Sequence, residues 1–502
     1  MGLDAVLFHS FSFMVFFPLT LLVQYVLPAK VRYLWLLAAS YFFYMCWNPA
    51  YAVLLFAITA LTYLCGLLLS GAKEQRRQKC LVALGFVCCV GLLIYFKYWP
   101  FLTESINSLL AVAGLPARLP AFDVLLPVGI SFYTFQALGY LVDVYRGKMA
   151  AERNFFRYAL FVGFFPQLMS GPITRAPEML PQFEKPRPFD FDQVRKGLLF
   201  MLWGLFLKLV IADRAAILVN TVYNDPLNHV GLTMVVATLF FSLQIYCDFA
   251  GYSATAIGAA QVLGFDLGIN FRQPYLATSV SDFWRRWHIS LSSWFRDYLY
   301  IPLGGSRRSR WRKYLNIMIT FLVSGLWHGA NWSYLIWGGL NGLAQVLGDC
   351  RRQLSSHICK SKWAAPLLSA SKDKPFSARL LSTLATFFII NLTWVFFRAP
   401  SAEAALLILR RSVIVFNPWI FVDGSLFRLG IGQGEFGMLM LAVALLVLVD
   451  VLHERGFSFR TQLLKQQLWF RWLVYLSMLF AVLLLGMYGP STDAATFIYA
   501  QF

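Results

Sequence analysis

Charged residues are scarce in this 502-residue chain, at 13% against about 25% in an ordinary soluble protein. Hydrophobic residues make up 59% of it and aromatic residues 17%. So few polar side chains cannot cover the surface of a globular protein. The composition therefore excludes a soluble globular domain, a disordered chain and a collagen-like fibre.

Acidic residues are scarcer than basic ones, at 24 Asp and Glu against 43 Lys and Arg, which gives a net charge of +19. A basic chain is typical of nucleic-acid-binding proteins when the charge is clustered on a soluble face. The position of the charge along the chain decides between nucleic acid and other partners.

Cysteine pairs with metal-ligand spacing are missing. The eight Cys include no Cys-x-x-Cys pair, so we expect small apolar filler rather than a metal site or a disulfide framework. We predict no bound metal and no tightly bound cofactor.

Long runs without Asp, Glu, Lys or Arg are abundant, and a membrane-spanning helix needs about 20 apolar residues. The runs are 5–29, 33–72, 80–96, 124–142, 158–174, 226–247, 249–265, 314–348, 380–397 and 472–492. The run 33–72 holds two helices broken at Pro49, since proline cannot donate a backbone hydrogen bond. Two shorter runs become spans if Lys208 and Asp450 lie inside the helix bundle. The sequence predicts an all-α polytopic membrane protein with 11–12 transmembrane helices and additional re-entrant or interfacial helices.

The net charge of the loops differs between the two predicted sides of the membrane. With the N-terminus outside, the inside loops 73–79, 306–313 and 349–379 carry +3, +5 and +5, whereas the outside loop 399–435 carries 0. Basic loops mark the cytoplasmic side, so the net charge indicates orientation beside anionic lipid. We predict a multi-pass protein of a bacterial inner membrane with a periplasmic N-terminus, and we exclude nucleic acid as a partner.

The run 314–348 is too short for two full spans, yet both flanks carry inside-type charge. Its turn at His328–Asn331 should therefore lie below the outer surface, where irregular backbone is tolerated only inside protein or along a water-filled cavity. A neutral histidine there has one nitrogen that can accept a proton and one that a neighbour can orient, as a general base requires. The alternative is a His328 that packs between helices and bonds a carbonyl.

Large apolar residues, mostly aromatic, recur at steps of three and four along 282–300, at Trp284, Trp287, Leu291, Trp294 and Tyr298. This spacing predicts one interfacial or re-entrant helix with an inward aromatic stripe. His288 adjoins the stripe, where a lone histidine is more often structural than functional.

Two further segments combine polar groups with apolar surroundings. Gly304 and Gly305 precede Arg307 and Arg308, so exposed backbone N–H groups beside cations could receive phosphates or an acidic carrier protein. The alternative is a positive-inside loop, and the spacing is not that of a Walker motif. Gln244 and Asp248 share a helix face, and pairing with a cation or contact with substrate is equally consistent with an intramembrane acid.

Read together, these segments resemble the membrane-bound O-acyltransferase family, and within it the bacterial branch of alginate O-acetylation proteins. The motifs are QIYCDFAGYS (244–253), NFRQPY (270–275), DFWRRWHISLS (282–292), RDYLYIPLGG (296–305) and GLWHGANW (325–332), with softer matches at 36–44, 126–133, 143–146, 167–172 and 499–502. The carboxylate that often follows Gly-Tyr-Ser in this branch is replaced by Ala254. Any role of that acid does not carry over, and Asp248 is the nearer candidate.

The resemblance implies a helical core around a central funnel and tunnel, with acyl transfer run through the membrane. It implies one domain over 1–502, with N-terminal helices in 1–150, a catalytic core in 151–348, and a cytoplasmic loop and C-terminal helices in 349–502. The family's two histidines fall on His328 and His288, which become the expected catalytic residues. The expected tunnel and substrate-binding residues are Trp284, Trp287, Trp294, Trp327, Asn331, Gln244, Tyr246 and Asp248, and the expected donor-docking residues are Gly304, Gly305, Arg307 and Arg308.

The expected reaction moves acetyl from a cytoplasmic thioester, acetyl-CoA or an acetylated carrier, to a hydroxyl of an extracytoplasmic polysaccharide such as alginate. Membrane lipid and a periplasmic acetyltransferase or esterase-like protein are the expected partners. Three alternatives stay open: D-alanyl transfer to teichoic acid from a carrier protein, secondary transport, and a structural role in polysaccharide export.

Overall fold

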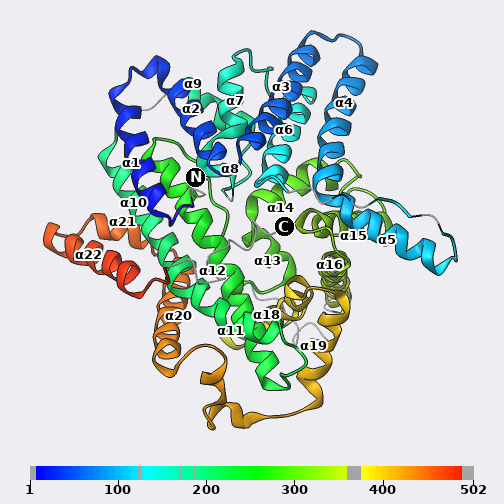
Figure 1. Ribbon diagram of the computed structural model, residues 1–502, viewed down its shortest axis with the longest axis vertical. Coiled ribbons are helices and arrows are strands. Elements are labelled where there is room, and N and C mark those ends of the chain that lie inside the picture. Colours follow the sequence, from blue (N-terminus) through cyan, green and yellow to red (C-terminus); the bar gives the residue numbers. More distant parts are fainter. Residues whose placement is uncertain are drawn as a thin grey trace. The chain divides into compact units, whose positions relative to one another are not determined.

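The computed structural model describes residues 7–116, 118–120, 122, 126–169, 171–185, 188–358 and 375–488. Every regular element in these ranges is a helix (Figure 1). The prediction of an all-α protein is therefore confirmed. The motif at 499–502 lies outside the described residues.

Several helices are long and apolar enough to cross a membrane, as judged by length and composition. In the described chain there are 6, namely Pro49–Gly71, Gln75–Val112, Leu232–Val262, Phe376–Arg398, Gln433–Glu454 and Leu468–Leu485. The chain is a multi-pass membrane protein. The expected total of 11–12 spans stays a prediction, because shorter apolar helices such as Phe11–Val26 do not meet these criteria.

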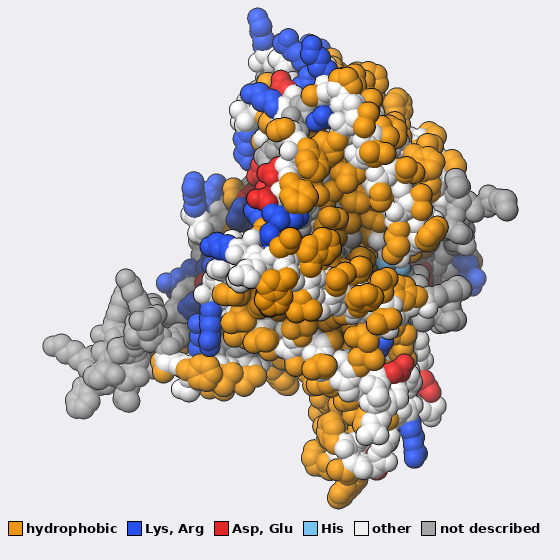
Figure 2. All heavy atoms as spheres, turned by 90° about the vertical axis from the view of Figure 1, so that its left-hand side faces the viewer, with side chains coloured by type: hydrophobic (Ala, Val, Ile, Leu, Met, Phe, Trp, Pro, Cys, Tyr) orange, Lys and Arg blue, Asp and Glu red, His pale blue; other side chains and the backbone are white. Residues whose placement is uncertain are grey.

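Hydrophobic side chains cover most of the face shown in Figure 2, and Lys and Arg side chains lie mainly along its margins. Within each of the chain's two compact units large apolar side chains are exposed on the helices, for example Leu19 and Leu22 in the first unit and Leu441 and Leu448 in the second. Such apolar helix surfaces suit contact with lipid.

The chain forms two compact units, each described here by itself. The first comprises residues up to Leu205 together with Gly251–Ile269. Its helices are α1 (Phe11–Val26), α2 (Arg32–Met45), α3 (Pro49–Gly71), α4 (Gln75–Leu93), α5 (Trp99–Val112), α6 (Ile130–Tyr145), α7 (Phe155–Gly163), α8 (Phe165–Leu168), α9 (Ala176–Glu184) and α10 (Phe191–Leu205), with a 3₁₀ turn η1 (Ala29–Val31) and a π-helical turn η2 (Ile94–Tyr98). These units do not test the three-part organisation predicted from the sequence, which stays a prediction.

Helices α3, α4 and α6 lie side by side in the first unit (Figure 1). Small residues make this possible, since a Cβ atom at Gly66 would lie 2.6 Å from the Tyr140 ring. The expected break before Pro49 is confirmed, because α2 ends at Met45 and α3 begins at Pro49. The Asn48 side chain caps α3 by accepting the backbone N–H of Ala50 at 2.9 Å.

The second unit comprises Phe206–Ala250 and the described residues from Asn270 onward, and α12 (Leu232–Val262) runs from it into the first unit. Its other helices are α11 (Asp213–Tyr223), α13 (Val280–Arg286), α14 (Ile289–Phe295), α15 (Arg310–His328), α16 (Trp332–Ile358), α18 (Phe376–Arg398), α19 (Ala402–Ile414), α20 (Gln433–Glu454), α21 (Phe459–Leu464) and α22 (Leu468–Leu485). Shorter turns are the π-helical η3 (Phe206–Ala212) and η5 (Arg296–Tyr300) and the 3₁₀ turns η4 (Pro274–Leu276), η6 (Pro418–Phe421) and η7 (Ser425–Arg428).

Helices α15 and α16 form an antiparallel pair joined by a three-residue turn, as expected for 314–348. A Cβ atom at Gly325 would meet the backbone of Tyr334, and one at Gly338 would meet the backbone of Phe321. Glycine at both positions therefore lets the two helix axes approach closely. The pair holds His328 at the last residue of α15.

Candidate active site

His328 is 2% exposed and lies in an aromatic box. Its ring centroid is 5.0 Å from that of Trp327, 5.0 Å from that of Trp337 and 5.4 Å from that of Phe397. Helices α15, α16 and α18 each contribute to this box. A buried imidazole fixed by three rings has the position of a base held in one orientation.

The turn after His328 is fixed by Asn331. Its Oδ1 accepts the backbone N–H of Ser333 at 2.9 Å and so caps α16, and its Nδ2 donates to the carbonyl of Pro400 at 3.1 Å. Asn331 thus shapes the turn beside His328.

The expected single helix over 282–300 is wrong. Helix α13 ends at Arg286, and His288 takes a left-handed backbone with φ +43° before α14 begins at Ile289. The physical reason is that the neighbouring segment 270–272 makes the backbone hydrogen bonds that a continuous helix would need for itself. Asn270 accepts the N–H of Ile289 at 2.9 Å through its carbonyl, and the N–H of Arg272 donates to the carbonyl of Arg286 at 2.9 Å.

Asn270 also fixes the tautomer of His288. Its Oδ1 accepts the backbone N–H of Ser290 at 3.2 Å and the hydroxyl of Ser290 at 2.9 Å, so this atom is an acceptor. His288 Nδ1, at 3.2 Å from the same Oδ1, must therefore carry a proton. The other ring nitrogen, Nε2, is then the acceptor of the imidazole.

His288 lies outside the six candidate spans and is 1% exposed. Burial lowers the pKa of its imidazole to about 3, because desolvation disfavours the charged form. The ring is therefore neutral between pH 5 and 8, with Nε2 as its acceptor nitrogen.

Both histidines contact the same indole. The ring of Trp327 lies 5.9 Å from that of His288 and 5.0 Å from that of His328. The structure thus brings together three residues named from the sequence.

The other predicted tryptophans divide. Trp287 packs on Trp394 at 5.2 Å, and Trp394 stacks on Trp337 at 5.9 Å, so an aromatic wall runs from Trp287 to the His328 box. Trp284 packs on Trp337 at 5.6 Å and donates to Asn341 Oδ1 at 3.2 Å. Trp294 packs instead on Phe295 and Tyr298, with ring centroids 5.7 Å and 5.1 Å away.

The polar residues of α12 take structural partners. Asp248 Oδ1 lies 2.7 Å from Lys208 Nζ, which also lies 2.8 Å from Asp213 Oδ1, and all three side chains are buried. Tyr246 donates its hydroxyl to Asp450 Oδ2 at 3.1 Å. Of the two alternatives for Asp248, pairing with a cation is the one observed. Gln244 is buried on the same helix.

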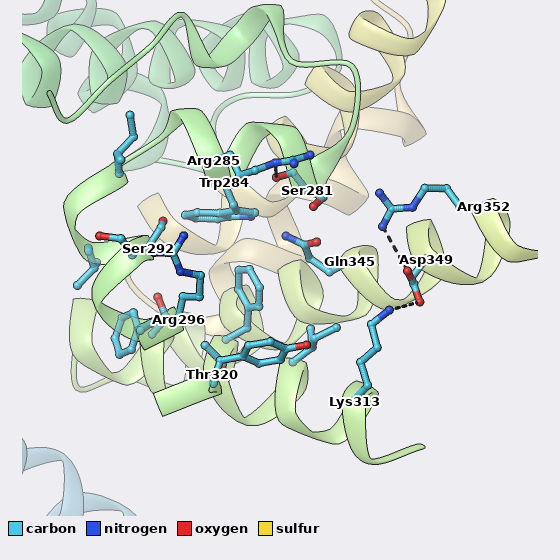
Figure 3. Close-up of a pocket in the computed structure, with 18 residues that line it drawn as sticks. Ser281, Trp284, Arg285, Ser292, Arg296, Lys313, Thr320, Gln345, Asp349 and Arg352 are labelled. Atoms are coloured by element: carbon cyan, nitrogen blue, oxygen red, sulfur yellow. Dashed lines mark hydrogen bonds and ion pairs between the residues drawn. The ribbon is translucent and has the colours of Figure 1, made fainter. Parts of the chain in front are cut away.

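A pocket of about 390 Å³ opens in the second unit (Figure 3). Its lining combines Trp284 and other aromatic residues with four cations, Arg285, Arg296, Lys313 and Arg352, and one carboxylate, Asp349. Asp349 Oδ2 lies 2.7 Å from Lys313 Nζ and Oδ1 lies 3.4 Å from Arg352. The excess of cations suits an anionic ligand.

The predicted docking glycines lie beside this pocket in the sequence but do not line it. Gly304 and Gly305 have φ +112° and +55°, values that favour glycine. Arg307 and Arg308 are exposed. The cations that do line the pocket come from four separate elements, and only Lys313 belongs to the predicted basic loop.

Sequence reasoning did not single out several residues of the site. Asn270 begins the motif NFRQPY, and this polar residue in front of Phe271 could have been recognised as a candidate site residue. Trp337, Trp394 and Phe397 carried no such signal, because buried aromatic residues on apolar helices are the rule in this chain.

Substitution of Asn270 tests whether Nε2 of His288 must accept a proton. Asn270→Asp puts a carboxylate at the protonated Nδ1, which favours the imidazolium and raises the pKa of His288. We expect the acid side of the pH–rate profile to move to higher pH. Asn270→Ala, the control, should lower the rate evenly across pH, and an Asp variant whose profile overlays the wild type would contradict the assignment.

The profile of the membrane-bound O-acyltransferase family matches residues 151–370. A probable alginate O-acetylase of Azotobacter vinelandii is 35% identical over 442 residues, which is 87% of this chain and 82% of that protein. A peptidoglycan O-acetyltransferase of Helicobacter pylori is 34% identical over 79% of this chain and 78% of its own length. A teichoic acid D-alanyltransferase of Bacillus subtilis is 27% identical over 59% of this chain and 75% of its own length.

The matched segment contains both histidines, the Trp327 contact and every lining residue of the pocket. The similarity to the alginate O-acetylase extends over nearly the whole chain. The chain therefore belongs to the membrane-bound O-acyltransferase family, as an O-acetyltransferase.

Proposed function

We propose that this enzyme passes an acetyl group from a cytoplasmic thioester, acetyl-CoA or an acetylated carrier, to a hydroxyl of an extracytoplasmic polysaccharide. The observation that carries the proposal is the arrangement of a cation-lined pocket and a two-histidine centre in one unit. Trp284 lines the pocket and packs on Trp337, which packs on His328. Two rings therefore separate donor and reaction sites.

In the proposed reaction His328 takes the proton of the acceptor hydroxyl as its oxygen attacks the acetyl carbonyl. The new O–C bond forms, the C–S bond of the thioester breaks, and the proton passes from His328 to the departing thiolate. No oxidant, metal or further cofactor is needed. A short-lived acetyl group on His328 is the alternative route.

His288 supports this step through its acceptor nitrogen. A neutral imidazole with a fixed Nε2 can hold the acceptor hydroxyl, or a water beside it, in line with the acetyl carbon. Trp327 lies against both histidines and would exclude bulk water from the space between them.

The contacts in the second unit are consistent with the predicted topology. Arg379, in the loop 349–379 predicted to lie inside, pairs at 3.1 Å with Glu454 at the end of α20, and Glu454 also pairs at 2.6 Å with Arg286 of the expected interfacial segment. Ends predicted to face outward also meet, since Arg411 donates to the carbonyl of His229 at 2.9 Å. We place the pocket on the cytoplasmic side of a bacterial inner membrane and the N-terminus in the periplasm.

The names of the relatives support a polysaccharide as the acceptor. Two of them are named for alginate and peptidoglycan acetylation, and the D-alanyl alternative rests on weaker similarity. We propose alginate or a similar exopolysaccharide, reached directly or through a periplasmic acetyltransferase or esterase-like protein. Mass spectrometry of surface polysaccharide should show acetyl esters that disappear on deletion of the gene and return with the wild-type chain. Unchanged esters would contradict the function.

Charge removal in the pocket tests the donor site. Arg285→Gln and Arg296→Gln should each raise the KM for acetyl-CoA about tenfold, because a charged hydrogen bond contributes about 1.5–3 kcal/mol and 1.4 kcal/mol is tenfold. kcat at saturating donor should change little.

Arg307→Gln is the matched comparison, since Arg307 is exposed and does not line the pocket. A larger effect at Arg307 than at Arg285 or Arg296 would move the donor to the glycine loop. Repeating the assay with an acetylated carrier protein in place of acetyl-CoA shows which of the two is the donor.

A further inference from the structure

The indole of Trp337, on α16, joins the donor pocket to the His328 centre. Its ring centroid lies 5.6 Å from that of Trp284, which lines the pocket (Figure 3), and 5.0 Å from that of His328. An acetyl group that enters from the pocket and reaches the base therefore passes along Trp337.

The indole N–H of Trp337 is an uncommitted hydrogen-bond donor. Its Nε1 is buried and has no hydrogen-bond partner among the described residues. Trp284, by contrast, donates its own Nε1 to Asn341 Oδ1 at 3.2 Å. A buried donor without a partner destabilises the folded protein, and native proteins pair nearly all such groups. An unpaired donor beside the proposed base therefore points to a role in the reaction.

The proposed reaction creates a need for a donor at this place. When the acceptor oxygen attacks the acetyl group, the carbonyl carbon becomes tetrahedral and the carbonyl oxygen takes up negative charge. The C=O double bond forms again as the C–S bond breaks. An N–H group that is already oriented toward that oxygen stabilises the transition state more than the ground state.

Two other polar side chains of the centre have different tasks. Asn331 holds the turn after His328, because its Nδ2 donates to the carbonyl of Pro400 at 3.1 Å. His288 carries its proton on Nδ1, beside Asn270 Oδ1, so its Nε2 can accept a hydrogen bond but cannot donate one. Trp337 is the indole whose ring contacts both a residue of the pocket and the base.

His328 and Trp337 are closed to solvent together, with exposed fractions of 2% and 0%. Their rings meet edge to face, at an angle of 88° between the planes. Because both groups are buried, an acetyl group must part the two rings to reach the base. That movement presents the base and the indole N–H to the same carbonyl group, and water is excluded until the donor arrives.

We propose that Trp337 is a catalytic residue whose indole N–H donates to the carbonyl oxygen of the acetyl group and stabilises the oxyanion. The inference rests on the proposed function and adds the group that works opposite His328. His328 takes the proton of the acceptor hydroxyl, and Trp337 holds the charge that develops on the carbonyl oxygen. The charge returns to the thiolate when the C–S bond breaks, and the proton follows it from His328.

The test removes the N–H and keeps an aromatic ring. Trp337→Phe is the first variant. Benzothienylalanine introduced at position 337, with sulfur in place of the N–H, is the second and preserves the shape of the indole. Each full-length protein in native membranes receives an alginate oligosaccharide with either acetyl-CoA or its dithioester analogue, in which sulfur replaces the carbonyl oxygen. Sulfur is a weak acceptor, so the analogue gains little from the N–H.

Both variants should lower kcat with acetyl-CoA about 10²–10³-fold, the range for loss of one oxyanion donor, with little change in KM. Because the sulfur donor loses less, the ratio of kcat for the oxygen donor over the sulfur donor should fall at least about tenfold. Trp327→Phe is the matched comparison, since its ring also lies 5.0 Å from that of His328, and it should keep the wild-type ratio.

A purely structural Trp337 predicts equal losses with the two donors, and an unchanged ratio in both Trp337 variants would overturn the inference. A ratio that falls in Trp327→Phe instead would overturn it as well. In either case acetyl transfer by the wild-type protein would leave the proposed function intact. Transfer by the wild type from neither acetyl-CoA nor an acetylated carrier would contradict both.

Discussion

Replacing His328 by alanine is expected to lower the rate of acetyl transfer about 10²–10⁴-fold, the range for loss of a positioned acid–base group. His328 is surrounded by the rings of Trp327, Trp337 and Phe397. None of these three rings can accept a proton, so none of them replaces the base. Release of free thiol from labelled acetyl-CoA and formation of acetyl ester measure the loss.

Folding must be separated from chemistry in that experiment. His328→Gln keeps most of the volume of the side chain and should be as inactive as the alanine variant. His229→Ala is the matched control, because this histidine lies in the loop before α12 and its carbonyl, not its ring, accepts from Arg411. Activity of both His328 variants within threefold of the wild type would remove His328 from the mechanism.

The largest expected stability effect belongs to Lys208. Its ammonium lies within 2.8 Å of carboxylate oxygens of Asp213 and Asp248, and the three side chains are between 2% and 6% exposed. Lys208→Met leaves two buried carboxylates without a cation, which costs about 3–5 kcal/mol. Thermal unfolding in detergent should show a midpoint several degrees lower.

Two comparisons make the Lys208 result specific. Lys208→Met combined with Asp248→Asn removes one of the stranded charges and should recover part of the loss. Arg157→Met breaks a pair whose carboxylate, Glu184, is 58% exposed and should cost at most about 1 kcal/mol. Equal losses for Lys208→Met and Arg157→Met would contradict the account of this cluster.

Some features of the fold follow directly from the sequence. The turn after His328 was predictable because 35 residues without Asp, Glu, Lys or Arg, between two basic flanks, cannot form two full spans. The break at Pro49 was predictable because proline lacks a backbone donor. Both depend on residues within one short segment.

The break at His288 could not be predicted in the same way. The periodicity of 282–300 favours one helix, and the competing hydrogen bonds come from Asn270 and Arg272. The cations of the pocket likewise come from α13, η5, α15 and α16. Periodicity describes one element, whereas these features depend on contacts between elements.

The mechanism places the donor on one side of the membrane and the acceptor on the other. Reconstituted vesicles with labelled acetyl-CoA in the compartment facing the Lys- and Arg-rich loops, and a uronic acid oligosaccharide with the periplasmic partner in the opposite one, test this directly. The account predicts labelled ester in the acceptor compartment, free CoA in the donor compartment, and loss of both with His328→Ala. Ester formation only when donor and acceptor share a compartment would contradict transfer across the membrane.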